Sequence, residues 1–311
     1  MKNKRNFTCC IVIPVYRLPL PEDELSSLTN TMLLLASYSI RLVCPQGLDP
    51  NLDLSLGHLL EDAVKAGRDV EVTYFSTSFF ESVSTYNNLM LSPSFYQKFI
   101  AWDYILIAQL DAWIFSPDLA CWLEYGYSYL GAPWLSLADL PLGLDCPKEA
   151  VGNGGLSLRR VVHHHAVLVS WRFRYSPVLG LREILSAHSP LQPCSEGVSM
   201  HSLLRFLNRM FLVLRRLASW RNSLSYYAKC GLNEDILLGL LAPRVFPWFR
   251  VADPRVAARF SLDENPGFFF QRYLGSDSLP FGCHAWRKSY ASFWQAVPSD
   301  LPSFGKPGSL R

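Results

Sequence analysis

The segment WDYILIAQLDAWIF, residues 102–115, contains an apolar run at 104–108 that leads directly into Gln109-Leu110-Asp111. A nearly continuous apolar run is typical of a central parallel strand that is buried on both faces. In open α/β sheets, ligands bind outside the carboxyl ends of such strands. The segment therefore predicts an α/β fold with a mostly parallel sheet, and it places Asp111 where a functional site is expected.

Asp111 is the only carboxylate of this segment after Asp103. Burying an unpaired carboxylate costs several kcal/mol or forces the group to take up a proton. We therefore expect a metal ion or a strong hydrogen-bond donor beside Asp111. The alternative is an aspartate that begins the turn at Ser116-Pro117-Asp118, and the segment alone does not separate the two interpretations.

The composition indicates a globular protein with a large core. Half of the 311 residues are hydrophobic and 14% are aromatic, which excludes a disordered chain. The length suits one large domain, with or without an insertion. The net charge of +3 is too small to indicate a nucleic-acid partner unless the basic residues cluster.

The cysteines and the N-terminus predict a cytoplasmic protein. Eight cysteines show neither C-x-x-C nor metal-ligand spacing, and most lie in apolar surroundings, so we expect reduced core thiols. The basic start is followed by an apolar run that is too short for a signal peptide or a membrane-spanning helix.

Strand and helix patterns alternate outward from the central segment. Strands are expected at 9–16, 40–44, 70–75 and 104–108, and helices at about 21–38, 56–66 and 79–99, with a break at Pro93. This alternation predicts parallel strands joined by right-handed crossovers. Neither GxGxxG nor GxxxxGK[ST] occurs, so a dinucleotide-binding Rossmann fold and a P-loop are not supported.

A glycine-rich segment follows a short strand expected at 129–134. Residues 152–155 are Gly-Asn-Gly-Gly, which requires positive φ or a close approach of the backbone. Asn-Gly is also a strong hairpin signal, although a two-residue turn needs only one glycine. The bare amides would suit a phosphate or a sugar. Three histidines follow at 163–165 on an expected helix, where their side chains diverge, so a three-histidine metal site is not expected.

Two further positions have both a structural and a functional interpretation. Asn233-Glu234-Asp235 precedes an apolar helix, and N-capping with acids in the first turn is a sufficient structural account. His284 lies among aromatic residues, as core histidines often do. A neutral imidazole is also a good ligand for a Mn²⁺-like ion at a carboxylate site.

Taken in order, the motifs IPVY, FFxSVxxYN, QLDAW, LGAPW, GNGGxSLR, NED and LPFGCHAW resemble an uncharacterised family of bacterial glycosyltransferases. The resemblance extends from about Ile11 to Trp286. It implies a GT-A-like nucleotide-sugar-binding fold, with a mostly parallel central sheet flanked by helices. The implied organisation is one domain over 1–311, with a nucleotide-sugar-binding half at 7–135 and an acceptor half at 150–290 that includes a helical insertion at about 175–225.

The resemblance also implies a reaction. A sugar would pass from a nucleotide-sugar donor, with a UDP-sugar favoured, to a carbohydrate or glycolipid acceptor in the synthesis of cell-envelope polysaccharide or glycolipid. In such enzymes an Asp-x-Asp triplet holds Mn²⁺ or Mg²⁺ on the donor diphosphate. Here Gln109-Leu110-Asp111 retains only the last acid, so Asp111 and His284 are the candidate metal ligands.

The remaining site residues are implied in the same way. Glu234-Asp235 matches the Glu-Asp pair of inverting transferases, in which one acid is the catalytic base. Adjacent helical residues diverge by about 100°, and the apolar pattern does not decide which acid faces the cleft. The resemblance favours Asp235 as the base, with Glu234 binding acceptor hydroxyls or capping the helix. The expected donor and acceptor contacts are Pro14, Tyr16, Tyr86, Asn87, Gln109, Trp134, Asn153, Gly154 and Gly155.

Other interpretations stay open. One is a non-catalytic sugar- or nucleotide-binding protein of the same fold, since one acid of the metal triplet is missing. Another is a metal-dependent phosphodiesterase, which normally has more clustered histidine and aspartate ligands. Residues 203–221, LLRFLNRMFLVLRRLASWR, segregate arginines from apolar side chains. This segregation suits a helix on an anionic membrane, here the inner face, or a helix that covers the core.

Overall fold

The computed structural model describes residues 6–135, 147–172, 232–275, 278–287 and 290–296, together with nine single positions between 204 and 224. Most of the expected insertion at 175–225 therefore lies outside the described residues. In the expected amphipathic helix at 203–221, positions 204, 207, 208, 210–212, 214 and 215 are helical, and the other positions lie outside the description. No helix among the described residues is long and apolar enough to cross a membrane.

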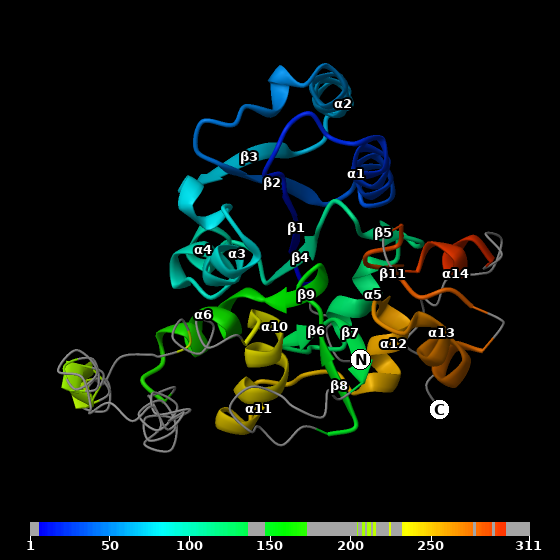
Figure 1. Ribbon diagram of the computed structural model, residues 1–311. Coiled ribbons are helices and arrows are strands. Elements are labelled where there is room, and N and C mark those ends of the chain that lie inside the picture. The colour runs from blue at the N-terminus through cyan, green and yellow to red at the C-terminus, as the bar shows by residue number, and fades with distance from the viewer. Residues whose placement is uncertain are drawn as a thin grey trace, which may run out of the picture.

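A six-stranded sheet forms the centre of the protein, in the order β3-β2-β1-β4-β9-β6 (Figure 1). The first four strands of this order are mutually parallel, whereas β9 runs antiparallel to both β4 and β6. The fold is therefore α/β with a mostly parallel central sheet, as predicted. The strands are β1 (Cys9–Pro14), β2 (Ser39–Pro45), β3 (Val70–Phe75), β4 (Tyr104–Ala108), β6 (Tyr129–Leu130) and β9 (Leu156–Arg160).

Burial explains why β1 and β4 take the middle of the sheet. Every residue of both strands is buried, as expected for an apolar run that helices cover on both faces. In Figure 1 the helices α1 and α2 lie on one side of the parallel strands, and α3 and α4 lie on the other. The helices of this half are α1 (Glu22–Leu34), α2 (Leu54–Lys65), α3 (Val83–Met90), α4 (Pro93–Lys98), α5 (Leu119–Glu124) and α6 (Val161–Val169), with short helical turns η1 (Pro50–Leu52) and η2 (Thr77–Phe79).

Local signals set the helix boundaries. The Asp53 carboxylate accepts the backbone N–H groups of Ser55 and Leu56 and so starts α2. Ser82 and Thr85 form a capping box at the start of α3. The break expected at Pro93 is confirmed, because Pro93 occupies the first turn of α4, where its missing N–H is tolerated.

Two small sheets extend the central one. The first has the order β10-β11-β5 and the second pairs β7 with β8. Their strands are β5 (Trp113–Ile114), β7 (Ala132–Leu135), β8 (Glu149–Gly152), β10 (Ser261–Leu262) and β11 (Gly282–Cys283). The expected strand at 129–134 is therefore two strands in different sheets, β6 and β7, separated at Gly131. An added Cβ at Gly131 would overlap the carbonyl oxygen of Gly152, so the chain turns there with no room for a side chain.

The hairpin interpretation of the glycine-rich segment is wrong. β8 pairs with β7, and β9 pairs with β4 and β6, so the strands on either side of Asn153 are not partners of each other. The link carries the chain from one sheet to the next.

The C-terminal part is mainly helical and packs against these sheets (Figure 1). The helix expected after Asn233 begins as the α-helix α10 and continues as the π-helical segment η4. Gly239 lies so close to the Val151 carbonyl of β8 that an added Cβ would overlap it. The elements are α10 (Glu234–Ile236), η4 (Leu237–Leu241), α11 (Ala242–Val245), α12 (Pro254–Phe260), α13 (Pro266–Phe269), the π-helical η5 (Phe270–Leu274) and α14 (Ala291–Ala296).

Four core cysteines are free thiols, as predicted. They are Cys9, Cys10, Cys44 and Cys283, and all four are buried. Burial raises the pKa of the Cys10 thiol to about 12, which keeps it protonated and inert.

Candidate active site

A cavity of about 550 Å³ opens at the carboxyl ends of β1 and β4. This is the edge of an α/β sheet at which ligands are expected. The volume falls within the range of small-molecule sites. Its lining comes from the end of β1 (Pro14, Tyr16), α1 (Glu24), the start of α3 (80–83, 86, 87), the β4–β5 link (109–111), the β8–β9 link (153–155), the start of α10 (233–235) and Asp263, Glu264 and His284.

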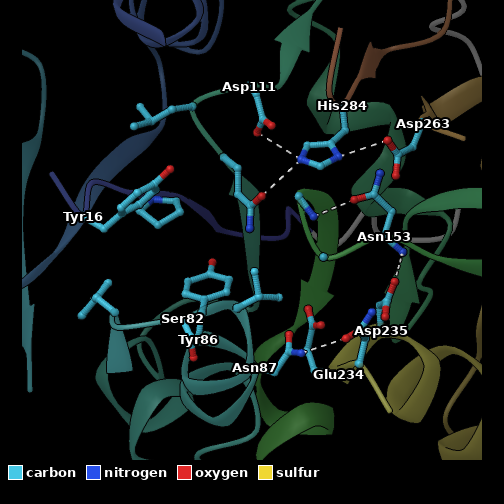
Figure 2. A pocket seen from close by; sticks show the side chains of 18 of the residues that line it. Tyr16, Ser82, Tyr86, Asn87, Asp111, Asn153, Glu234, Asp235, Asp263 and His284 are labelled. Atoms are coloured by element: carbon cyan, nitrogen blue, oxygen red, sulfur yellow. Dashed lines mark hydrogen bonds and ion pairs between the residues drawn. The ribbon is translucent and has the colours of Figure 1, made fainter. Parts of the chain in front are cut away.

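The cavity brings together nearly all of the predicted site residues, from segments far apart in the sequence (Figure 2). Trp134 is the exception, because it is not part of the lining. It belongs to β7, and its indole nitrogen lies behind Gly152, 2.7 Å from where a Cβ of that glycine would stand. The predicted contact of Trp134 with donor or acceptor therefore has no counterpart in the cavity lining.

Asp111 and His284 form an ion pair at one wall of the cavity. Asp111 Oδ1 lies 3.1 Å from His284 Nε2, and Asp263 Oδ1 lies 3.2 Å from His284 Nδ1 (Figure 2). The strong donor expected beside Asp111 is therefore His284. The turn interpretation of Asp111 is not supported, since the Ser116 hydroxyl accepts the Asp118 N–H and begins that turn.

Two carboxylates control the charge of the His284 imidazole. Burial alone would lower the pKa of His284, but the hydrogen bonds and negative charges of Asp111 and Asp263 outweigh burial and raise the pKa to about 9. At neutral pH, with no metal ion bound, the ring is an imidazolium that donates from both nitrogens. The interpretation of a core histidine bonded through one nitrogen is therefore wrong.

The geometry of this pair fits a divalent ion. Neighbouring ligands of an octahedral Mg²⁺ lie about 3 Å apart at metal–ligand distances of about 2.1 Å. Asp111 Oδ1 and His284 Nε2 are 3.1 Å apart, and Gln109 Oε1 is 3.2 Å from the same nitrogen. Asp263 at Nδ1 is the carboxylate partner that metal-bound histidines typically have.

Further ligands for such an ion would have to come largely from outside the protein. Within the described ranges, no group of three or more His, Cys, Asp or Glu side chains is arranged to hold a metal. Phosphate oxygens and water commonly complete the coordination of Mg²⁺ in proteins. An ion at this pair would replace the proton on Nε2, because a histidine that binds a metal ion must be deprotonated at the ligating nitrogen.

The β8–β9 link holds the opposite side of the cavity in place. Asn153 has a φ of 75°, which confirms that the segment needs a positive φ, although at the asparagine and not at a glycine. Asn153 Oδ1 accepts the Gly155 N–H at 2.6 Å, and the Asn153 N–H donates to Asp235 Oδ2 at 2.8 Å. These amides therefore bind protein groups, not an incoming anion.

Glycine is required in this link because side chains approach the backbone closely. An added Cβ at Gly154 would overlap the Glu234 carboxylate, and one at Gly155 would overlap the His284 ring. The link thus packs directly against both halves of the site.

Glu234 and Asp235 face different surroundings, as expected for adjacent helical residues. Glu234 is 4% exposed, and its Oε1 accepts from Arg159 Nη2 at 2.8 Å. The Arg159 guanidinium is fully buried and also donates to the Ser157 and Tyr96 hydroxyls. Glu234 is therefore the counter-ion of a buried arginine.

Asp235 is the carboxylate that is poised to exchange a proton. Burial and the charge of Glu234 raise the pKa of Asp235 to about 7, although the N–H groups of Asn153 and Ile236 favour its charged form. A pKa near the working pH is what general acid–base catalysis requires.

Asn233 does not cap α10 with its side chain. It occupies the N-cap position, but no side-chain capping bond forms, and its Oδ1 accepts from Asn87 Nδ2 at 3.0 Å. The capping interpretation is wrong for this residue, which instead links α3 to α10 under the cavity.

The three consecutive histidines are not a metal site. His163 Nδ1 shares a hydrogen bond with the Ser128 hydroxyl, while the His164 ring is fully buried. His164 Nδ1 lies 3.0 Å from the Arg160 carbonyl. The two rings thus point to different partners.

Sequence reasoning missed several residues of the cavity. Asp263 and Glu264 follow the short strand β10, so an acid after a strand was the available signal. That strand has only two residues and gives almost no periodicity. Glu24 gave no signal, because acids in the first turn of a helix are ordinary.

These features define an α/β protein with a ligand site at the carboxyl edge of a mostly parallel sheet. A family model described as a protein of unknown function, DUF5672, matches residues 69–284, which is more than half of the chain. The chain belongs to that family. No curated protein matches the chain.

Solved structures give more distant likenesses. PaToxG glycosyltransferase is 11% identical with a TM-score of 0.28, over 74% of this chain and 85% of that chain. The bifunctional glycosyltransferase WbbM is 12% identical with a TM-score of 0.43, over 91% of this chain and 46% of that chain. TarS of S. aureus is 13% identical with a TM-score of 0.32, over 66% and 43%. The match thus spans less than half the length of the last two chains.

Proposed function

We propose that this protein is a metal-dependent glycosyltransferase that moves a sugar from a nucleotide-sugar donor, with a UDP-sugar favoured, to a hydroxyl of a carbohydrate or glycolipid acceptor. One observation carries the proposal. A single cavity at the carboxyl edge of the sheet holds Asp235, whose pKa is raised to about 7, together with an Asp111–His284 pair 3.1 Å apart that suits a diphosphate-bound ion.

Asp111 and His284 would hold Mn²⁺ or Mg²⁺, with Gln109 Oε1 within reach of the same position. The ion would neutralise the negative charge that develops on the departing diphosphate. Asp263 accepts a hydrogen bond from His284 Nδ1 and fixes the ring so that Nε2 points toward Asp111. The missing first acid of the triplet is thus offset in part by a carbonyl oxygen and a histidine.

Asp235 is the base of the proposed reaction. The acceptor oxygen forms a bond to the anomeric carbon while the bond from that carbon to the diphosphate oxygen breaks, and the hydroxyl proton passes to the Asp235 carboxylate. The N–H groups of Asn153 and Ile236 hold this carboxylate at 2.8 Å each, so its orientation is set before substrate arrives. Direct attack with one base inverts the anomeric configuration.

Glu234 supports the site through its charge. Its Oε1 accepts from Arg159, and the negative charge of Glu234 raises the pKa of Asp235. Glu234 also lines the cavity, where it would contact an acceptor hydroxyl.

The cellular setting is part of the proposal. A cytoplasmic enzyme of envelope polysaccharide or glycolipid synthesis would meet a lipid-linked acceptor at the inner face of the membrane. The helical positions within 203–221 include exposed apolar side chains, with Leu207 43%, Phe211 62% and Leu214 55% exposed. Such side chains, with Arg215 in the same helical segment, suit contact with anionic lipid. Sedimentation with liposomes that contain or lack anionic lipid tests this.

The function is tested by incubating the protein with a set of nucleotide sugars and Mn²⁺ and by identifying the nucleotide released. Release of a nucleoside diphosphate, abolished by EDTA, is expected. Release of a nucleoside monophosphate would instead indicate a phosphodiesterase. Binding without turnover, over a range of carbohydrate and glycolipid acceptors, would leave a sugar- or nucleotide-binding protein.

A further inference from the structure

Glu24 lines the cavity but has no part in the chemistry above. It lies in the first turn of α1 and is only 7% exposed. Its Oε1 accepts from Arg17 Nη2 at 2.8 Å. Its Oε2 is buried and has no hydrogen-bond partner within the described residues. Leaving a buried carboxylate oxygen without a donor is unfavourable, so a ligand that supplies an N–H or O–H is expected to face it.

The position of Glu24 identifies the part of the ligand that it meets. The inference rests on the proposed function, in which the diphosphate lies at Asp111 and His284 and the sugar lies toward Asp235. In Figure 2 Tyr16 lies across the cavity from Asp235 and Asp263. Glu24 and Tyr16 both line this cavity, near the end of β1. The nucleoside of the donor is the part that remains to fill this end.

The chemistry at this end suits a nucleobase better than a phosphate. A carboxylate repels a phosphate group but accepts a hydrogen bond from a neutral N–H. The Tyr16 ring is 46% exposed and offers a flat apolar surface of the kind on which bases stack. Arg17 is not part of the cavity lining, and its guanidinium holds the Glu24 carboxylate from behind through Oε1, so that Oε2 is the oxygen left for a ligand.

We propose that Glu24 selects the nucleotide of the donor by accepting a hydrogen bond from an N–H of the base through Oε2. Uracil supplies such a group in its N3–H. Oε2 would accept a hydrogen bond from this N–H, while Arg17 holds Oε1 of the same carboxylate. Since a hydrogen bond to a charged group contributes about 1.5–3 kcal/mol, its loss weakens binding by about tenfold or more.

The experiment measures binding of UDP, N3-methyl-UDP, GDP, CDP and ADP to the full chain by calorimetry with saturating Mn²⁺. Glu24→Gln is compared with wild type and with Glu22→Gln, an exposed acid of the same helical turn. We expect wild type to bind UDP best and to lose about tenfold or more on N3-methylation. Glu24→Gln should lose a similar factor for UDP and little more on methylation, while Glu22→Gln matches wild type.

The outcomes separate the two levels of the argument. If another nucleotide binds best and Glu24→Gln still lowers its affinity tenfold, Glu24 contacts that base, and only the assignment of uracil is overturned. Equal affinity of Glu24→Gln and wild type for the preferred nucleotide overturns the role of Glu24 and leaves the glycosyltransferase proposal intact. No binding of any nucleotide to wild type would overturn the proposed function itself. The methylated nucleotide tests the inference in wild type, so the result does not depend on the variant folding.

Discussion

Asp235 is the residue on which the proposed chemistry depends most directly. Its carboxylate is oriented by two backbone N–H groups, and its pKa is raised to about 7. General-base catalysis contributes about 10²–10⁴ in rate. We therefore expect Asp235→Asn to lower kcat by that factor while the affinity for the donor changes little. Single-turnover kinetics and donor binding measured together check this, and full activity of the variant would remove Asp235 from the mechanism.

The raised pKa of Asp235 also predicts a pH profile. Below about pH 7 the base is protonated, so kcat/KM should fall about tenfold per pH unit at saturating Mn²⁺ and level off above pH 7. Stability has the opposite trend. Because the folded state holds this proton more tightly than the unfolded chain, the contribution of Asp235 to the free energy of unfolding decreases as pH rises from about 4 to about 7. In chemical denaturation between pH 4 and pH 7, the free energy of unfolding should decrease less in Asp235→Asn than in wild type.

Glu234 is expected to contribute to stability as the counter-ion of Arg159. Removing one partner of a buried ion pair costs about 3–5 kcal/mol, because the other charge is left uncompensated. Glu234→Gln would leave the fully buried Arg159 in that state. Urea denaturation should show the lower free energy of unfolding of Glu234→Gln. Glu61→Gln, which breaks the exposed pair with Lys65, should lower the free energy of unfolding almost not at all. A stable Glu234→Gln variant with a raised acceptor KM would point instead to acceptor binding.

At the scale of single residues, the sequence predicted one acid and one histidine of the metal pair. Asp111 could be predicted because a long buried strand leads into it, and His284 because of its aromatic setting. The counter-ion role of Glu234 could not be predicted, since Arg159 is 75 positions away along the chain. Asp263 was missed because pairing across β10 and β11 brings it to His284, and both strands have only two residues.

At the scale of elements, the β8–β9 link determines whether the two halves of the site can meet. An added Cβ at Gly155 would overlap the His284 ring. We expect Gly155→Ala to displace the imidazole from Asp111 and to weaken Mn²⁺ binding strongly in a protein that still folds. Gly267→Ala is the matched control, because its added Cβ would have its nearest neighbour at 3.8 Å. Calorimetry with Mn²⁺ and circular dichroism provide the two measurements, and unchanged Mn²⁺ affinity in Gly155→Ala would contradict the metal assignment.

The same link shows where sequence patterns end. The parallel strands β1 to β4 and the helices between them followed from apolar runs and from Pro93. From the segment at 152–155 we predicted a positive φ and close approaches of the backbone, which the structure confirms. The hairpin prediction, in which the strands on either side pair with each other, was wrong. Asn-Gly is compatible both with a hairpin and with a crossing between sheets, and only the pairing of β9 with β4 decides between them.

At the scale of the whole molecule, the cavity joins segments from Pro14 to His284, so a ligand that binds there should stabilise the entire fold. A ligand at 100 times its Kd adds about 2.7 kcal/mol to the free energy of unfolding, or roughly 4 °C in Tm for a chain of this size. If the ion bridges the protein and the diphosphate, Mn²⁺ and UDP must each raise the affinity for the other by the same factor. We therefore expect the full Tm shift only when Mn²⁺ and UDP are both present.

The Asp111→Asn variant tests the metal assignment. It should remove the Mn²⁺-dependent part of the Tm shift and leave the Tm of the free protein nearly unchanged. An equal shift by UDP in Mn²⁺ and in EDTA would contradict the metal assignment while leaving a nucleotide site in place.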